Sequence, residues 1–504
     1  MPSSAVLALD QGTTGSTALV VSNDGRVLSR AYSEFTQHFP RPGWVEHDAS
    51  EIWEVTTRVA RNALADPAVR DASVEALGIT NQRETLVVWD RATLEPVAPA
   101  IVWQDRRTQT ICRELREKGL EEEVRSRTGL LLDPYFTGTK LTWLFREHPE
   151  LRIRAETGEL AMGTVDAWLV ARLTGGRVHA TDFTNASRTL LYDLDEGGWS
   201  PRLLELLEVP APVLPEIRPS AGSFGVTSGD ALGLEIPILG VAGDQQAALY
   251  GQGCWEEGLA KNTYGTGSFL LLHTGSERVR SASGLLTTVA CDAEGGPAYA
   301  LEGAIFIAGA AIQWLRDGLG LLEAAAESEA LARGMEENDG VYFVPAFVGL
   351  GAPWWDPEAR GMITGLTRGT TRGHLARAAL EAMAYQTADV LEAMEEDSGV
   401  PLTELRVDGG ASQNDWLMDF QAGILGVPVH RAAIVETTAF GAAGLAGVES
   451  GVWESPGAFL EARIPATVFE PRMDAGLRDR LRQGWRRAVA ATLAWSRNES
   501  PTGR

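Results

Sequence analysis

Residues 5–25, AVLALDQGTTGSTALVVSNDG, decide the fold, because two apolar runs flank a turn of Gly, Thr and Ser. Apolar runs separated by such residues predict a β-hairpin, here with its turn at residues 12–15. A second stretch of the same kind, GLAKNTYGTGSFLLLHTG at 258–275, predicts a hairpin with its turn at residues 265–268. Two similar hairpins, one at the start of each half, indicate two related domains.

Alternating strands and helices extend between and beyond the two hairpins, which favours an α/β fold. The expected strands are 76–80, 86–89 and 238–242, and the expected helices are 49–65, 138–147, 165–173, 375–395, 415–425 and 475–496. We expect the domains to span residues 1–250 and 251–504, with the second hairpin opening the second domain. A cleft between two such domains is a natural ligand site.

Composition and charge exclude several classes of protein. The chain has 504 residues, with 44 Lys and Arg against 68 Asp and Glu, for a net charge of −24. Nucleic-acid binders carry a basic face, and no cluster of Lys and Arg supplies one here, so we expect no nucleic-acid partner. No run of about eighteen apolar residues occurs, so no membrane span is expected. Three scattered cysteines and the lack of a basic leader favour a cytoplasmic protein.

The first turn, DQGTTGST at 10–17, has the composition of a phosphate-binding loop. Glycines allow close approach of the backbone, and the hydroxyls of Thr13 and Thr14 add donors. Asp10, at the end of the strand, is placed to hold Mg²⁺ directly or through water. The alternative is an ordinary hairpin turn. The second turn, which contains Thr266, has the same composition, and two facing turns could grip consecutive phosphates of one nucleotide.

A third glycine-rich element, VDGGASQN at 407–414, follows a short strand and opens an amphipathic helix. Gly409 and Gly410 would let a flat ligand lie against the backbone, and Asn414 offers it an amide. The alternative is a plain strand-to-helix turn in which Ser412 or Asn414 caps the helix.

Polar groups that follow two of the expected strands could bind a substrate. Large polar residues between apolar strands, such as NQRE at 81–84, are unusual unless they line a cleft. Arg83 and Glu84 offer a donor fork and an acceptor, which suits the neighbouring hydroxyls of a polyol; the alternative is a hairpin loop with a surface ion pair. Asp244, after the strand at 238–242, is either a helix N-cap or a catalytic carboxylate.

Taken together and in order, a series of motifs over about residues 6–447 resembles the glycerol kinase branch of the FGGY carbohydrate kinases. They are DQGTTGST, NQRET, IVWQDRRT, TGLLLDPYFTGTK, GVAGDQQAALYGQG, NTYGTGSF, VPAFVGLGAPWWDPEARGMITGLTRGTT and DGGASQNDWLMDFQA. The resemblance implies two actin-like ATPase domains of the ribonuclease-H-like type, with nucleotide and alcohol meeting in the cleft between them. It also implies Mg²⁺-assisted transfer of phosphate from ATP to glycerol, giving sn-glycerol 3-phosphate and ADP, by a homodimer or homotetramer.

The resemblance further implies roles for individual residues. Asp244 would be the general base that takes the proton from the attacking hydroxyl, and Asp10 with Asp244 would orient Mg²⁺. The residues that would hold glycerol are Arg83, Glu84, Trp103, Tyr135, Asp244, Gln245 and Phe269. The residues that would surround the nucleotide are Thr13, Thr14, Thr266, Gly309, Gln313, Gly410, Ala411 and Asn414.

The sequence departs from the family in two places. Thr17 stands where Arg is often found and Gly15 where Ser is frequent, so another cation, or Mg²⁺ alone, would neutralise the terminal phosphate. Some members are inhibited by fructose 1,6-bisphosphate through a glycine-rich loop that ends in Arg just before Ile-Pro. Glu235 stands at that place here, with Asp230 nearby, so we expect no such inhibition.

Two other functions stay open at this point. One is an FGGY kinase for another small polyol or a ketose. The other is an actin-like ATPase that acts in assembly and transfers no phosphate to an alcohol.

Overall fold

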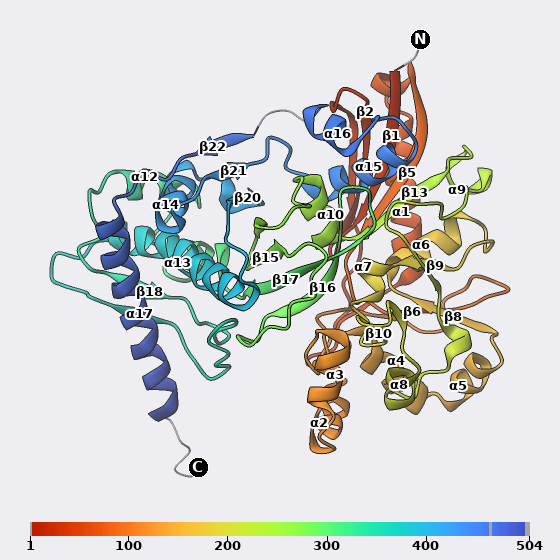
Figure 1. The fold of residues 1–504 in the computed structure, drawn as a ribbon, viewed down its shortest axis with the longest axis horizontal. Coiled ribbons are helices and arrows are strands. Elements are labelled where there is room, and N and C mark those ends of the chain that lie inside the picture. Colours follow the sequence, from red (N-terminus) through yellow and green to blue (C-terminus); the bar gives the residue numbers. More distant parts are fainter. Residues whose placement is uncertain (1–2, 463–465, 499–504) are drawn as a thin grey trace.

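The computed structural model describes residues 3–462 and 466–498, which form two α/β halves around two β-sheets (Figure 1). The strand order of the first sheet is β13-β5-β1-β2-β3. Its strands are β1 (Ser3–Gln11), β2 (Gly15–Ser22), β3 (Val27–Glu34), β5 (Ala72–Asn81) and β13 (Ile238–Gly243). Strands β1, β2 and β3 are antiparallel, whereas β5 and β13 run parallel to β1.

The second sheet repeats this arrangement in the order β16-β17-β15-β14-β20-β21-β22. Its strands are β14 (Leu259–Tyr264), β15 (Ser268–His273), β16 (Leu286–Cys291), β17 (Pro297–Ile305), β20 (Glu404–Asp408), β21 (Val429–Arg431) and β22 (Thr467–Phe469). Each sheet contains an antiparallel hairpin. A third antiparallel strand lies on one side of the hairpin and two parallel strands lie on its other side. The duplication expected from the two hairpins is therefore confirmed.

Short strands and helices complete each half. The short strands are β4 (Glu46–His47), β6 (Val87–Asp90), β7 (Ala100–Ile101), β8 (Leu160–Gly163), β9 (Ala180–Asp182), β10 (Tyr192–Asp193), β11 (Gly198–Trp199), β12 (Glu216–Arg218), β18 (Tyr342–Val344) and β19 (Met362–Thr364). The helices before β14 are α1 (Ala49–Leu64), α2 (Gln109–Glu117), α3 (Glu121–Thr128), α4 (Thr137–Glu147), α5 (Pro149–Glu156), α6 (Val165–Leu173), α7 (Phe183–Ala186), α8 (Pro201–Leu206), α9 (Gly229–Leu232) and α10 (Asp244–Gly251). The later helices are α11 (Gly309–Gln313), α12 (Glu327–Arg333), α13 (Arg372–Ser398), α14 (Asp415–Leu425), α15 (Thr437–Glu449), α16 (Pro456–Ala462) and α17 (Ala475–Asn498).

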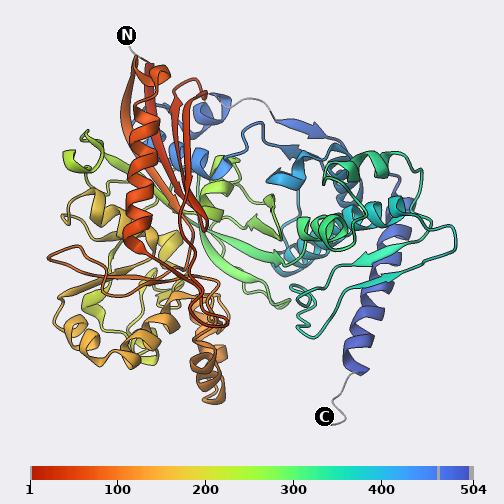
Figure 2. The ribbon, with the colours of Figure 1, turned by 180° about the vertical axis from the view of Figure 1, so that it is seen from behind.

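Helix α1 shows how local sequence sets these elements. The Asp48 side chain caps the helix by accepting a hydrogen bond from the Ser50 N–H at 2.8 Å. Ile52, Val55 and Val59 then recur at helical spacing and are buried against the first sheet. Seen from behind, α1 lies along this sheet, and α17 stands at the far end of the second half (Figure 2).

Helix α15 returns from the second half of the chain and covers the other face of the first sheet, beside β1 and β5 (Figure 1). Its approach depends on glycines. A Cβ on Gly78 of β5 would lie 2.1 Å from the Ala442 carbonyl oxygen, and one on Gly441 would lie 1.8 Å from the Ala247 oxygen of α10. The two halves are thus joined by a tightly packed helix pair, α10 and α15.

Among residues 3–462 and 466–498, none of the helices combines the length and the apolar character needed to cross a membrane.

Candidate functional site

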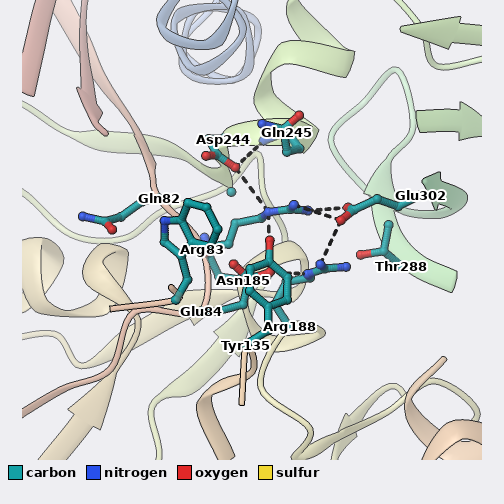
Figure 3. Close-up of polar contacts among 12 residues, drawn as sticks. Gln82, Arg83, Glu84, Tyr135, Asn185, Arg188, Asp244, Gln245, Thr288 and Glu302 are labelled. Carbon is teal, nitrogen blue, oxygen red and sulfur yellow. Dashed lines mark hydrogen bonds and ion pairs between the residues drawn. The ribbon is translucent and has the colours of Figure 1, made fainter. Parts of the chain in front are cut away.

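A buried group of charges lies where the second sheet meets the loop after β5 (Figure 3). The guanidinium of Arg83 donates from Nη1 to Glu302 Oε2 at 2.6 Å and from Nη2 to Glu302 Oε1 at 3.1 Å. Its Nε lies 3.2 Å from Asp244 Oδ1. The Arg83 and Glu84 side chains are only 2% and 1% exposed, so the alternative of a surface ion pair is wrong.

Arg188, which follows α7, completes this group. Its Nε donates to Glu84 Oε1 at 2.6 Å, and its Nη2 donates to Glu302 Oε1 at 2.9 Å. Sequence reasoning missed both Arg188 and Glu302. Glu302 could have been noticed as the single charged residue in the strand PAYALEGAI, whereas Arg188 carries no comparable signal.

The backbone of Glu84 is held in a left-handed conformation, with φ of 62°. Such a conformation is costly for a residue with a side chain and persists only where the surroundings enforce it. Its carbonyl oxygen accepts hydrogen bonds from Lys140 Nζ and from Thr137 Oγ1, both at 3.0 Å. Burial lowers the pKa of Lys140 to about 7. Two side chains at the start of α4 therefore fix where Glu84 points.

Aromatic side chains stand beside the charged group. The rings of Trp103 and Tyr135 meet edge to face with centroids 5.6 Å apart, and the Arg188 guanidinium lies 5.8 Å from the Tyr135 ring. Trp103 Nε1 donates to Thr13 Oγ1 at 2.9 Å, which ties this aromatic pair to the β1–β2 turn. The arrangement offers both polar groups and flat apolar surface to a small hydroxylated molecule.

Asp244 is the first residue of α10, and Gly243 is the residue in the N-cap position, so the N-cap interpretation of Asp244 is wrong. Its Oδ1 accepts a hydrogen bond from the Gln245 N–H at 2.7 Å. The side chain is 30% exposed, unlike those of Arg83 and Glu84, so a ligand can reach it. Burial raises the pKa of Asp244, and the charges of Arg83 and Lys261 oppose that shift.

Asp10, at the end of β1, shares its surroundings with two other carboxylates. Burial and the negative charges of Asp244 and Glu436 raise the pKa of Asp10 to about 7. Mg²⁺ is commonly bound through one or two carboxylates together with phosphate oxygens, and a cation here would relieve the repulsion. The donor set formed by Asp10 and Asp244 therefore fits Mg²⁺. In the part of the chain that the structure describes, no group of three or more His, Cys, Asp or Glu could hold a metal ion on its own.

Parts of two other segments expected to surround the nucleotide, α11 and the loop after β20, pack against the β14–β15 turn. The Thr266 carbonyl accepts from the Ala308 N–H at 2.9 Å, and a Cβ on Gly309 would lie 2.6 Å from the Gly265 oxygen. Gly409 has a φ of 86°, and a Cβ at this position would lie 2.3 Å from the Tyr264 carbonyl oxygen. The absence of a side chain therefore lets the loop pass close to the end of β14. Gln313 lies one helical turn after Gly309 on α11.

The third glycine-rich loop, residues 407–414, has features of both interpretations offered for it: it caps a helix, and part of its backbone is open to a ligand. Asn414 caps α14 by accepting from the Leu417 N–H at 2.9 Å, as the structural interpretation expects. Gly410 faces open space, since a Cβ there would meet nothing within 4 Å, and Ala411 is only partly buried. The backbone before the cap is thus accessible to a ligand.

Lys261 of β14 connects the two groups of residues. Its ammonium donates to Gln245 Oε1 and to Thr263 Oγ1. Burial lowers the pKa of Lys261 to about 8. Phe269 of β15 pairs with Ala304, and Leu271 pairs with Glu302, so Phe269 shares a sheet face with Glu302. Lys261 and β15 therefore lie between the buried charged group around Arg83 and the β14–β15 turn.

Gly15 and Thr17 are the two residues of the first turn at which the sequence departs from the family, and the structure explains Gly15. A Cβ on Gly15 would lie 2.7 Å from the Ser33 carbonyl oxygen and from the Tyr32 ring, so a side chain is excluded there. Thr17 lies in β2 opposite Asp10.

Two duplicated sheets with glycine-rich turns, and a buried polar group beside them, define a two-domain kinase of the actin-like ATPase fold. The chain belongs to the FGGY family of carbohydrate kinases: its N-terminal domain model matches residues 5–251 and its C-terminal domain model matches residues 260–450.

Similar proteins cover nearly the whole chain. Glycerol kinase of Halorhodospira halophila is 55% identical over 493 residues, which is 98% of this chain and 97% of that protein. Glycerol kinase 2 of Thermotoga maritima is 54% identical over 492 residues, covering 98% of this chain and 99% of that protein. The crystal structure of Plasmodium falciparum glycerol kinase with ADP is 35% identical, with a TM-score of 0.92 over 97% of this chain and 98% of that one.

Proposed function

We propose that this chain transfers the terminal phosphate of ATP to glycerol, giving sn-glycerol 3-phosphate and ADP. The observation that carries this assignment is the joining of Arg83, Glu84 and Asp244 beside the Trp103–Tyr135 pair. A charged donor, a carboxylate acceptor and an aromatic wall match a short chain of carbons with neighbouring hydroxyls. The two relatives named above, each more than 50% identical, are glycerol kinases, which supports the same substrate.

In the proposed reaction, one glycerol hydroxyl gives its proton to a carboxylate oxygen of Asp244 as its oxygen attacks the terminal phosphorus. The bond from that phosphorus to the bridging oxygen breaks, and ADP leaves. Phosphoryl transfer needs positioning and charge stabilisation more than covalent catalysis. Arg83 and Glu84 would bind the hydroxyls, with Gln245 beside them. Trp103, Tyr135 and Phe269 would pack against the carbons and exclude water.

We assign the nucleotide to the two glycine-rich turns and the residues around them. Thr13, Thr14 and Thr266 would contact phosphates, and Gly309, Gln313, Gly410, Ala411 and Asn414 would surround the rest of the nucleotide. Asp10 and Asp244 would hold Mg²⁺, which neutralises phosphate charge when bound. The open backbone at Gly410 supports this placement. We further expect a cytoplasmic homodimer or homotetramer, which sedimentation of the purified protein would check.

The deciding experiment measures ADP release with and without glycerol, and with a panel that includes erythritol and a pentulose. We expect strong dependence on glycerol and stoichiometric formation of glycerol 3-phosphate. Preference for another polyol or ketose would move the assignment within the family. Turnover of ATP that is independent of any added alcohol would instead support an ATPase that acts in assembly.

A further inference from the structure

Glu302 belongs to the second sheet but contacts charged residues of the first half. It lies on β17 among apolar neighbours, and its side chain is 3% exposed. Burial alone would raise the pKa of a carboxyl group, yet the two guanidiniums of Arg188 and Arg83 hold the pKa of Glu302 at about 2. The two guanidiniums thus favour the ionised form of this buried carboxylate.

The geometry around Glu302 determines how Arg83 is oriented. Both terminal nitrogens of Arg83 bind this one carboxylate, at 2.6 and 3.1 Å, which fixes the plane of the guanidinium. Its Nε is then left facing Asp244 at 3.2 Å. Glu302 Oε1 also accepts from Arg188 at 2.9 Å, so a single carboxylate separates two like charges (Figure 3).

We propose that Glu302 is a positioning residue of the glycerol-binding site. It acts through Arg83, which it orients toward Asp244 and the acceptor hydroxyl, and it does so from the opposite half of the molecule. This inference rests on the proposed function, because Arg83 is the residue assigned to the acceptor. Both carboxylate oxygens of Glu302 already accept hydrogen bonds from Arg83 or Arg188, so we assign it no direct contact with the substrate.

The first test is Glu302→Gln, which removes the negative charge of the side chain but keeps its shape. Loss of a buried hydrogen bond to a charged group predicts a rise in the KM for glycerol of roughly 10- to 100-fold, with a much smaller change in the KM for ATP. Glu381→Gln is the matched control, because Glu381 is equally buried, lies in the same half and accepts from Arg377 at 2.8 Å. We expect the control to lower the melting temperature and to leave the KM for glycerol unchanged.

A double-mutant cycle separates positioning from a general structural role. If Glu302 acts through Arg83, the Arg83→Ala/Glu302→Gln variant has the same KM for glycerol as Arg83→Ala alone. Additive increases would show that Glu302 acts independently of Arg83 and would overturn the inference. Should Glu302→Gln not fold, Glu302→Asp keeps the charge with a shorter reach, and the same non-additivity with Arg83→Ala is required of it.

Two different outcomes distinguish failure of this inference from failure of the proposed function. Absence of glycerol-dependent ADP release in the unaltered protein would refute the function. Normal glycerol phosphorylation together with an unchanged KM for glycerol in Glu302→Gln would refute only the role of Glu302.

Discussion

Asp244 is the carboxylate of the buried charged group around Arg83 that a ligand can reach. Arg83 and Glu84 are almost fully buried, whereas the Asp244 side chain is 30% exposed at the start of α10. A carboxylate in this place can accept a proton from a bound hydroxyl.

Asp244→Asn keeps the size of the side chain but removes the carboxylate that we propose as the proton acceptor. Turnover should fall by about 10²-fold or more, the usual effect of losing a general base, while glycerol binding weakens less. Single-turnover kinetics and calorimetric titration with glycerol measure the two effects separately. Asp193→Asn is a suitable control, since Asp193 is buried in the same half, accepts from Arg127 at 2.8 Å and is not assigned to glycerol, nucleotide or Mg²⁺. Near-normal turnover in Asp244→Asn would refute its assignment as the base.

At this scale the sequence predicted the residues whose motifs are distinctive, and it missed those that support them. NQRE stands out because four polar residues interrupt apolar strands, and all four prove to be buried. Lys140 and Arg188 support Glu84 from segments 56 and 104 residues away. Such contacts depend on how distant segments pack, and neither the local pattern nor the residue type specifies them.

Among the elements, α15 shows what a local pattern can and cannot predict. Its sequence, TTAFGAAGLAGVE, is almost entirely small and apolar, which indicates a helix that is buried on all sides. Nothing in that pattern says that it packs on β5 and β13, more than 190 residues earlier, because the pairing is set by glycines on both partners. The two hairpins, by contrast, were predicted correctly because their turns and apolar runs are local.

Gly441→Ala tests the contact between α15 and α10. The added Cβ would lie 1.8 Å from the Ala247 carbonyl oxygen, so the helices must separate. Overpacking of this kind predicts a loss of about 1–3 kcal/mol in the free energy of unfolding, measured by denaturant titration. Gly457→Ala in α16 is the control, since its Cβ would meet only the Ser455 hydroxyl, at 3.7 Å. Equal stability of the two variants would contradict the packing described for α15.

Helix α9 and the residues after it form the segment that corresponds to the bisphosphate loop of some family members. Arg61 of α1 donates to the carbonyl oxygens of Ala231 at 2.7 Å and of Asp230 at 3.0 Å, which anchors the backbone. Glu235 stands at the place where the resemblance to regulated family members implies Arg. Two negative charges would repel a bisphosphate here.

Fructose 1,6-bisphosphate should therefore leave the initial rate unchanged at fixed Mg²⁺. The measurement is a titration with the bisphosphate at low protein concentration, with ATP and glycerol held constant. Saturable inhibition that disappears when Asp230 or Glu235 is altered would show that this loop binds the effector after all.

At the scale of the whole molecule, the division at residues 250 and 251 remains a prediction that fragments can test. Residues 1–250 contain the first sheet but lack α15, which covers one of its faces. We expect this fragment to aggregate or to unfold without a cooperative transition, as followed by circular dichroism. Production together with residues 251–504 should restore a folded complex. A stable, cooperatively unfolding 1–250 fragment would show that the first half does not need α15.

The return of α15 to the first sheet has a consequence for the protein while it is being synthesised. A ribosome adds about 5–20 residues per second, so the segment between β13 and α15 takes roughly 10 to 40 s to make. During that interval the nascent chain already holds Val6, Ala8 and Ala76, whose partners Ala443 and Ala446 have not yet been translated. Uncovered apolar strands are the surfaces that chaperones bind. We therefore expect folding in a cell to require protection of the first sheet until α15, residues 437–449, has been translated.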